Sequence, residues 1–153
     1  MVKPIPDGYA ELTAYLSVAD TDAAIAFYTD AFGAKALQRY TAPDGSVPHA
    51  QIRIGGTIVM LSDENPALPG PKVLGGTPVT LYLFVEDVDA AFAQARQAGA
   101  EELRPVQDHF FGDRTGQVLD PFGHRWTLAS RIEDVSPAEF ERRADEFMRQ
   151  RKS

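Results

Sequence analysis

The sequence contains no cysteine among its 153 residues. Disulfide bonds, thiolate catalysis and zinc–thiolate sites are therefore excluded, and any chemistry must use oxygen and nitrogen groups. No stretch approaches the roughly 18 consecutive apolar residues that a membrane-spanning helix needs. The start, from Met1 to Pro6, also lacks the apolar core of a signal peptide. We therefore expect a cytosolic protein that has no membrane partner.

Positive charge is scarce, because 15 Lys and Arg residues stand against 22 Asp and Glu residues, for a formal net charge of −7. A chain this acidic is repelled by a polyanion unless its basic residues cluster. The nearest approach to a cluster lies within residues 142–152, where a solvated helix surface explains it. We therefore expect no nucleic-acid partner. The length and the 44% hydrophobic composition are typical of a single domain, residues 1–153.

The sequence repeats itself once. Residues 18–26 and 85–93 align with an offset of 67 residues, and most of the aligned pairs are identical. The match extends upstream to Tyr15 and Tyr82. Two related halves are the simplest explanation of this pattern.

Each half predicts the same order of elements. An alternating strand, Glu11 to Val18 or Val79 to Val85, runs into an aspartate suited to cap a helix. Helical spacing of apolar residues then predicts helices over about 22–32 and 88–98, each followed by a glycine. Three further strands are expected in each half, at about 36–40, 48–54 and 57–61, and at about 102–106, 114–119 and 125–129.

These elements predict an α+β fold of two tandem β-α-β-β-β modules that form a curved mixed sheet around a cup, plus a C-terminal helix. Module one is expected over about residues 9–64 and module two over about 77–131. Between them, the proline- and glycine-rich residues 65–76 predict an exposed connector. The C-terminal helix is expected over about 136–151, with Phe140, Ala144 and Phe147 on a face suited to pack on the sheet.

Alternation along the strands assigns their side chains to opposite faces. Leu12, Leu16 and their counterparts are expected beneath the helices, and the other face to line the cup. An apolar pocket with a few polar anchors is typical of small-molecule sites. Alternatively, the arginines pair with carboxylates at the rim, and the tyrosines pack at a dimer or module interface. The candidate ligand-binding residues are Thr13, Tyr15, His49, Gln51, Arg53, Met60, Thr80, Tyr82, Phe84, His109, Arg114, Gln117, Arg125 and Thr127.

Three local motifs accompany the paired modules: Ala24-Ile25-Ala26-Phe27-Tyr28 leading to Phe32-Gly33, the strand from His49 to Ile54, and the segment from Asp120 to Trp126. Together they resemble the vicinal oxygen chelate superfamily, which includes glyoxalases, bleomycin-resistance proteins and extradiol dioxygenases. The resemblance covers about residues 9–131. It implies a cup-shaped site for each pair of modules and, commonly, a homodimer.

The resemblance also implies four metal ligands, one inward-facing His, Gln or Glu from the first and last strand of each half. The corresponding positions here are Thr13, Met60, Thr80 and Thr127. Three neutral hydroxyls and a thioether hold a divalent ion poorly. We therefore predict no metal and no other cofactor. A site built around two histidines is conceivable, but nothing in their spacing demands it.

The residues thus favour metal-free binding or sequestration of a small, partly aromatic or amphipathic molecule in the cup. Whether the protein is an enzyme stays open, and no catalytic residue is assigned. The alternative is a metal-dependent lyase or dioxygenase of the glyoxalase type, which rests on the resemblance alone. A third possibility is an interaction module that uses the cup as a dimer surface.

Overall fold

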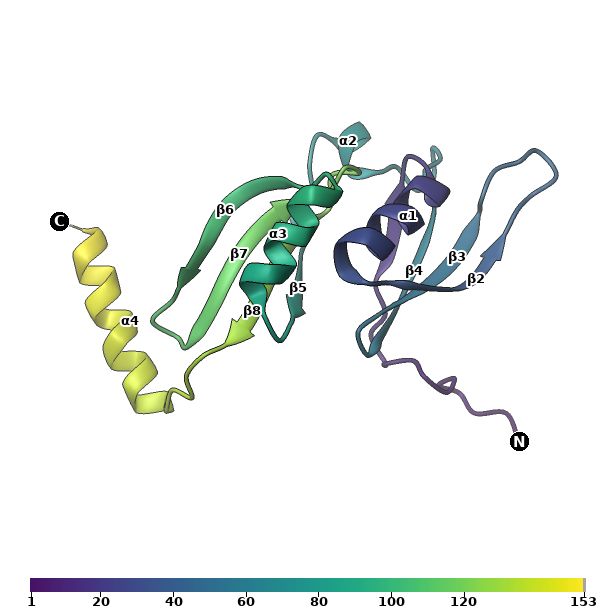
Figure 1. Ribbon diagram of the computed structural model, residues 1–153. Coiled ribbons are helices and arrows are strands. Elements are labelled where there is room, and N and C mark those ends of the chain that lie inside the picture. Colours follow the sequence, from purple (N-terminus) through teal and green to yellow (C-terminus); the bar gives the residue numbers. More distant parts are fainter. Residues whose placement is uncertain (153) are drawn as a thin grey trace.

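A computed structural model describes residues 1–152 and confirms the predicted fold class (Figure 1). Module one consists of β1 (Tyr15–Val18), α1 (Thr21–Phe32), β2 (Lys35–Tyr40), β3 (His49–Ile54) and β4 (Thr57–Asp63). Module two consists of β5 (Thr80–Phe84), α3 (Val88–Ala98), β6 (Glu101–Asp108), β7 (Asp113–Leu119) and β8 (Arg125–Arg131). The short helix α2 (Pro71–Leu74) lies in the connector, and α4 (Pro137–Arg151) follows module two.

Each module forms its own four-stranded mixed sheet. The strand order is β1-β4-β3-β2 in one module and β5-β8-β7-β6 in the other, so the two topologies are identical. The first strand pairs in parallel with the last, and the other neighbours are antiparallel. Both sheets therefore end in an edge strand, β1 or β5, that has one strand neighbour.

The helix caps follow the repeat as well. Asp20 accepts a hydrogen bond from the Ala23 backbone N–H at 2.9 Å, and Asp87 accepts one from Ala90 at 3.0 Å. A side-chain oxygen at this position satisfies a backbone donor that has no partner within the helix. The predicted helix starts are therefore confirmed.

A second equivalent pair anchors each helix to its sheet. Asp63 accepts a hydrogen bond from the Thr21 backbone N–H at 2.8 Å, and Ser130, 67 residues later, accepts one from Val88 at 3.0 Å. Asp63 also accepts the Val47 N–H at 2.7 Å. Burial raises the pKa of Asp63, but the hydrogen bonds from Val47 and Thr21 outweigh it and lower the pKa below its ordinary value.

The two modules meet at one buried carboxylate. The hydroxyl of fully buried Tyr28 on α1 donates to Asp120 Oδ2 of module two at 2.5 Å, and Trp126 Nε1 donates to the same oxygen at 3.0 Å. Burial, followed by the charge of Asp120, raises the pKa of Tyr28 well above its ordinary value. The ring of Phe32 packs 4.7 Å from that of Trp126, so the cores of the two modules are continuous.

The first strand is shorter than predicted. It begins at Tyr15 rather than Glu11, and the last backbone bond before it runs from Met60 N–H to the Ala14 carbonyl at 3.0 Å. Leu12 therefore leaves the sheet and is 88% exposed, contrary to its predicted place in the core. The alternation of apolar residues continues past the point at which the chain turns away.

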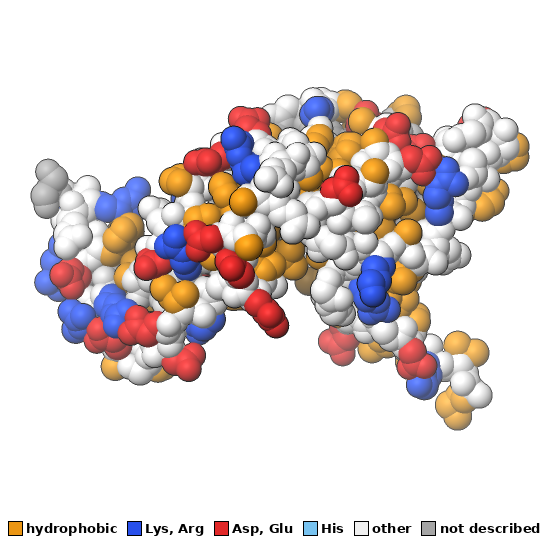
Figure 2. Space-filling view, in the orientation of Figure 1, with side chains coloured by type: hydrophobic (Ala, Val, Ile, Leu, Met, Phe, Trp, Pro, Cys, Tyr) orange, Lys and Arg blue, Asp and Glu red, His pale blue; other side chains and the backbone are white. Residues whose placement is uncertain are grey.

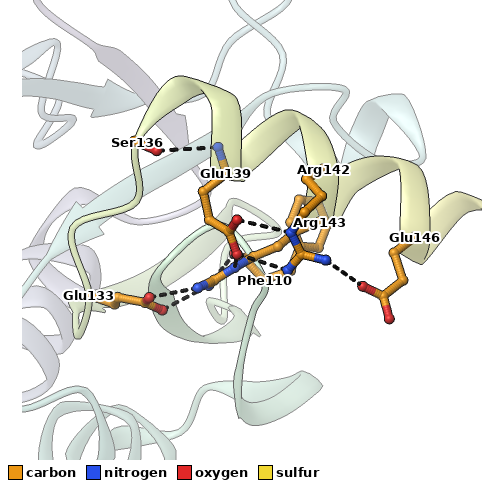
Figure 3. Close-up of polar contacts among 7 residues, drawn as sticks. All are labelled: Phe110, Glu133, Ser136, Glu139, Arg142, Arg143 and Glu146. Carbon is orange, nitrogen blue, oxygen red and sulfur yellow. Dashed lines mark hydrogen bonds and ion pairs between the residues drawn. The ribbon is translucent and has the colours of Figure 1, made fainter.

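The C-terminal helix packs on a loop instead of a sheet, which corrects the predicted packing. Phe147 and Phe140 lie 5.1 and 5.7 Å from the ring of Phe110 in the β6–β7 loop. Arg143 binds Glu133 and Glu139, each at 2.7 Å, and donates to the Phe110 carbonyl (Figure 3). Hydrogen bonds from Arg142 and Arg143 lower the pKa of Glu139 to about 2.

Charges of both signs intermix on the surface over α4 (Figure 2). The basic residues of this helix therefore do not form a uniformly positive patch on the face shown. Among residues 1–152, no helix is both long and apolar enough to cross a membrane.

Replacing Tyr28 with Phe removes one buried hydrogen bond while keeping the ring. We expect a loss of about 1–3 kcal/mol in the free energy of unfolding, because Asp120 stays buried with one donor fewer. Urea denaturation measures this loss. Tyr40→Phe is the control, since Tyr40 is 55% exposed. Equal stability of the two variants would contradict a role for the Tyr28–Asp120 bond.

Candidate functional site

Each sheet has one face covered by a helix and one open face. In module two, Gly116 and Leu128 are paired on the covered face, where a Cβ on Gly116 would lie 2.6 Å from the ring of Phe92 on α3. Gln117 and Thr127, one residue away on the same strands, therefore lie on the open face. In Figure 1 both α1 and α3 lie in front of their sheets, so the open faces point away from the viewer.

The open face of module one carries a chain of polar contacts. Tyr9, from the segment before β1, donates to Gln51 Oε1, and Gln51 Nε2 lies 3.0 Å from His49 Nε2. His49 Nδ1 in turn lies 3.4 Å from the Tyr15 hydroxyl. Three of the predicted site residues are therefore brought together, and Tyr9 joins them. Arg53 lies on the same face, beside Gly8.

The N-terminal segment covers part of this face. Ile5, Tyr9 and Glu11 line a cavity of about 460 Å³ together with Thr13 and Met60. Thr13 donates to the Ala10 carbonyl at 3.3 Å. Two of the four positions compared with metal ligands thus lie together, under a segment that the sequence reasoning had left out. No pattern of alternation or helical spacing in residues 1–10 identifies this contact.

Module two has a separate cavity of about 250 Å³ on its open face. Gln117 Nε2 donates to Thr127 Oγ1 at 3.1 Å, and His109 Nε2 lies 2.8 Å from Thr115 Oγ1. The His109 ring stacks on Phe111 at 4.9 Å. The residues lining this cavity are Tyr82, Arg104, Pro105, Gln107, His109, Phe111, Thr115, Gln117 and Thr127.

Tyr82 combines an exposed ring with an anchored hydroxyl. The hydroxyl donates to Asp113 at 3.3 Å, and burial of the oxygen together with the charge of Asp113 raises the pKa of Tyr82. The ring lies 5.2 Å from that of Phe84. Both residues are exposed, at 47% and 59%, and Thr80 beside them is exposed too. The hydrogen bond to Asp113 thus holds the hydroxyl while the ring of Tyr82 stays exposed beside that of Phe84.

Arg114 does not face the open side of its sheet, contrary to the prediction. Its guanidinium binds Asp89 on α3 at 2.8 Å and Asp108 at 2.8 Å, on the helix-covered side of the sheet. The strand alternation places its neighbours Asp113 and Thr115 on the open face and Arg114 opposite them. The prediction treated the loop from His109 to Arg114 as one segment that lines the cup. Because its guanidinium is bound to two carboxylates on the covered side, Arg114 does not line the open face.

The two open faces carry separate cavities. Thr13 and Met60 line one cavity, and Tyr82 and Thr127 line the other. The module-one cavity is formed by the segment before β1 together with Met60 on β4, and the module-two cavity draws its lining from β5 to β8. Of the four residues compared with metal ligands, Thr13 and Met60 therefore line one cavity and Thr127 the other, whereas Thr80 lines neither.

The sequence model described as the Glyoxalase/Bleomycin resistance protein/Dioxygenase superfamily matches residues 9–128. The chain belongs to this superfamily. It is 45% identical over 135 residues to the uncharacterized protein Mb0911c of Mycobacterium bovis, covering 85% of this chain and 89% of that one. It is 31% identical over 117 residues to At5g48480 of Arabidopsis thaliana, covering 71% of this chain and 70% of that one.

Solved structures of the superfamily share the fold. TioX from Micromonospora sp. ML1 superposes with a TM-score of 0.63 at 29% identity, covering 83% of this chain and 100% of that one. The fosfomycin resistance protein FosX from Listeria monocytogenes superposes with a TM-score of 0.62 at 16% identity, covering 92% and 99%. At 16% identity, the similarity to FosX is evidence for a shared fold and not for a shared function.

The four residues that the resemblance sets against metal ligands do not fit a divalent metal. Their donors are the hydroxyls of Thr13, Thr80 and Thr127 and the sulfur of Met60, none of which carries charge or imidazole nitrogen. The Thr127 hydroxyl already accepts the bond from Gln117. Within residues 1–152, no three His, Asp or Glu side chains are grouped so that they could hold an ion.

Tyr9→Phe removes the hydroxyl that fastens the N-terminal segment over Met60. Losing a hydrogen bond of about 1 kcal/mol raises the fraction of molecules whose N-terminal segment is detached roughly fivefold. We therefore expect peroxide to oxidise Met60 about two- to fivefold faster. Peptide mass spectrometry measures the rate, and Met148, exposed on α4, is the internal control. An unchanged Met60 rate would show that this hydrogen bond does not hold the segment in place.

Proposed function

We propose that the chain binds or sequesters a small, partly aromatic or amphipathic molecule without a metal, on the open faces of its modules. One observation carries this proposal. The chain has the fold of the superfamily, but the four positions compared with metal ligands hold residues that bind a metal poorly: Thr13, Met60, Thr80 and Thr127. On the sequence grounds given above, we assign this function to the cytosol.

The exposed rings supply the contact area for such a ligand. Tyr82 and Phe84 form a pair on module two, and Tyr15 is 45% exposed on module one. Two aromatic rings attract each other most strongly when they pack offset or edge-on. Gln51 and Gln117 supply amide groups for orientation, and each also makes a hydrogen bond within the protein. Such a mixture of apolar surface and few polar anchors is typical of ligand sites.

A homodimer completes this proposal. The edge strands β1 and β5 each have one strand neighbour, and an unpaired edge offers backbone N–H and C=O groups to another chain. Val79, Tyr82 and Phe84 add exposed apolar surface along β5. A second copy that covers these edges would set the module-one open face of one chain against the module-two open face of the other. The two open faces then form one cup.

A neutral fluorescent probe, N-phenyl-1-naphthylamine, tests the binding site. We expect saturable binding, with Tyr82→Ala weakening the affinity about tenfold because a ring contact of about 1–1.5 kcal/mol beyond its area is lost. Fluorescence titration measures the affinity. The matched control is Phe140→Ala, because Phe140 on α4 is 43% exposed but lines neither open-face cavity.

Equal loss in the Tyr82 and Phe140 variants, or no saturable binding, would contradict the proposed site. Elemental analysis of protein purified without added metal provides an independent check. About one tightly held divalent ion per chain would favour a metal-dependent lyase or dioxygenase instead.

The dimer is tested by Phe84→Glu, which puts a charge on the exposed apolar surface of β5. We expect the wild type to sediment at twice the 16.7 kDa chain mass and the variant at about the chain mass, because an unpaired buried charge is costly. Sedimentation equilibrium at micromolar concentration measures this, and Phe140→Glu is the control. A monomeric wild type, or a variant that stays dimeric, would rule out this interface.

A further inference from the structure

A further cavity, of about 350 Å³, lies where the connector crosses one end of the module-two sheet. Its walls include Lys72 and Gly75 of the connector, Thr77 directly after it, and Leu103, Leu119 and Arg125 of the sheet. Gly123 of the β7–β8 turn closes one side, and a Cβ there would lie 2.9 Å from Cβ of Pro71. The glycine therefore allows the connector to approach the turn closely and form the wall.

Arg125 places this cavity on the open face. It is paired with Leu119 on β7 and Thr80 on β5, and it lies two residues before Thr127 on β8. Residues two apart on a strand point to the same face, about 6.6 Å from each other. The cavity around Arg125 is therefore the neighbour, along β8, of the cavity lined by Tyr82, Gln117 and Thr127.

No other residue in the described part of the chain, residues 1–152, compensates the charge of Arg125. Its Nε is excluded from water and has no hydrogen-bond partner. Among residues 1–152, neither Arg125 nor Lys72 forms an ion pair, and the cavity lining contains no Asp or Glu. By contrast, Arg39, Arg114 and Arg131 each bind a carboxylate within 2.8 Å. A partly buried cation without a counter-ion gains more from an anion than an exposed one does, because less water screens it.

We infer that Lys72 and Arg125 bind an oxyanion, a carboxylate or a phosphate group, in this cavity. The inference deepens the proposed function, because it assigns an acidic group to the amphipathic ligand. The guanidinium supplies a planar fork that matches an oxyanion, and the lysine supplies a single mobile charge. Leu103 and Leu119 pack beside the group, and the apolar body of the ligand extends along β8 toward Tyr82.

The test compares 2-naphthoate with its neutral analogue 2-naphthamide by isothermal titration calorimetry. We expect the wild-type protein to bind naphthoate about tenfold more tightly than naphthamide, because a charge-assisted pair is about twice as strong as a neutral bond. Arg125→Gln and Lys72→Gln should each abolish this difference by lowering the affinity for naphthoate to that for naphthamide. Arg39→Gln, on the helix side of module one, is the control and should preserve the difference.

A second measurement does not depend on the aromatic part. The Arg125 Nε–Hε resonance, assigned by its loss in Arg125→Lys, should shift on titration with inorganic phosphate and not with chloride at equal ionic strength. Equal binding of the two naphthyl probes would overturn the oxyanion site and leave the proposed cup intact. If neither probe binds but phosphate shifts the resonance, the cup fails and the oxyanion site stands. A resonance unmoved by phosphate, with no preference for naphthoate, overturns the oxyanion site.

Discussion

The carboxylate of Asp120 is the contact on which the arrangement of the two modules depends. It accepts the hydroxyl of Tyr28, the indole N–H of Trp126 and two backbone N–H groups of its own turn, so its charge is satisfied although the residue is buried. Because Tyr28 belongs to module one and the other donors to module two, the pair fixes the helix-covered sides of both sheets against each other. Displacing any of these donors costs free energy, because a buried charge is then left without one of its hydrogen bonds.

This junction uses the covered faces and leaves the open faces outside it. The exposed rings of Tyr15, Tyr82 and Phe84 lie on those open faces, and β1 and β5 stay edge strands with one neighbour each. One contact between the modules does reach β1, where His124 Nε2 lies 2.9 Å from the Ser17 carbonyl. The same packing that gives the chain one continuous core thus leaves two open faces with separate cavities.

The sequence predicts the fold well because the repeat doubles each signal. Asp20 and Asp87 identify both helix starts, and residues at the same offset, Asp63 and Ser130, hold both helices to their sheets. Alternation fails where the backbone leaves the strand, as it does before Tyr15 and at the register shifts of β6 that bring Arg104 to the open face. The β6 shifts occur without the glycine that marks one common class of bulge, although Pro105 lies within the second shift.

The candidate site is less predictable because it depends on contacts between distant segments. Nothing near Tyr9 indicates Gln51, 42 residues away, and nothing near Lys72 indicates Arg125. The charge of a cavity wall is equally hard to predict, because the net charge of −7 describes the whole chain. At physiological salt, charges more than about 8 Å apart are largely screened. An oxyanion at Arg125 therefore interacts with the two nearest cations more strongly than with the distant acidic surface, so an acidic protein can bind an acidic ligand.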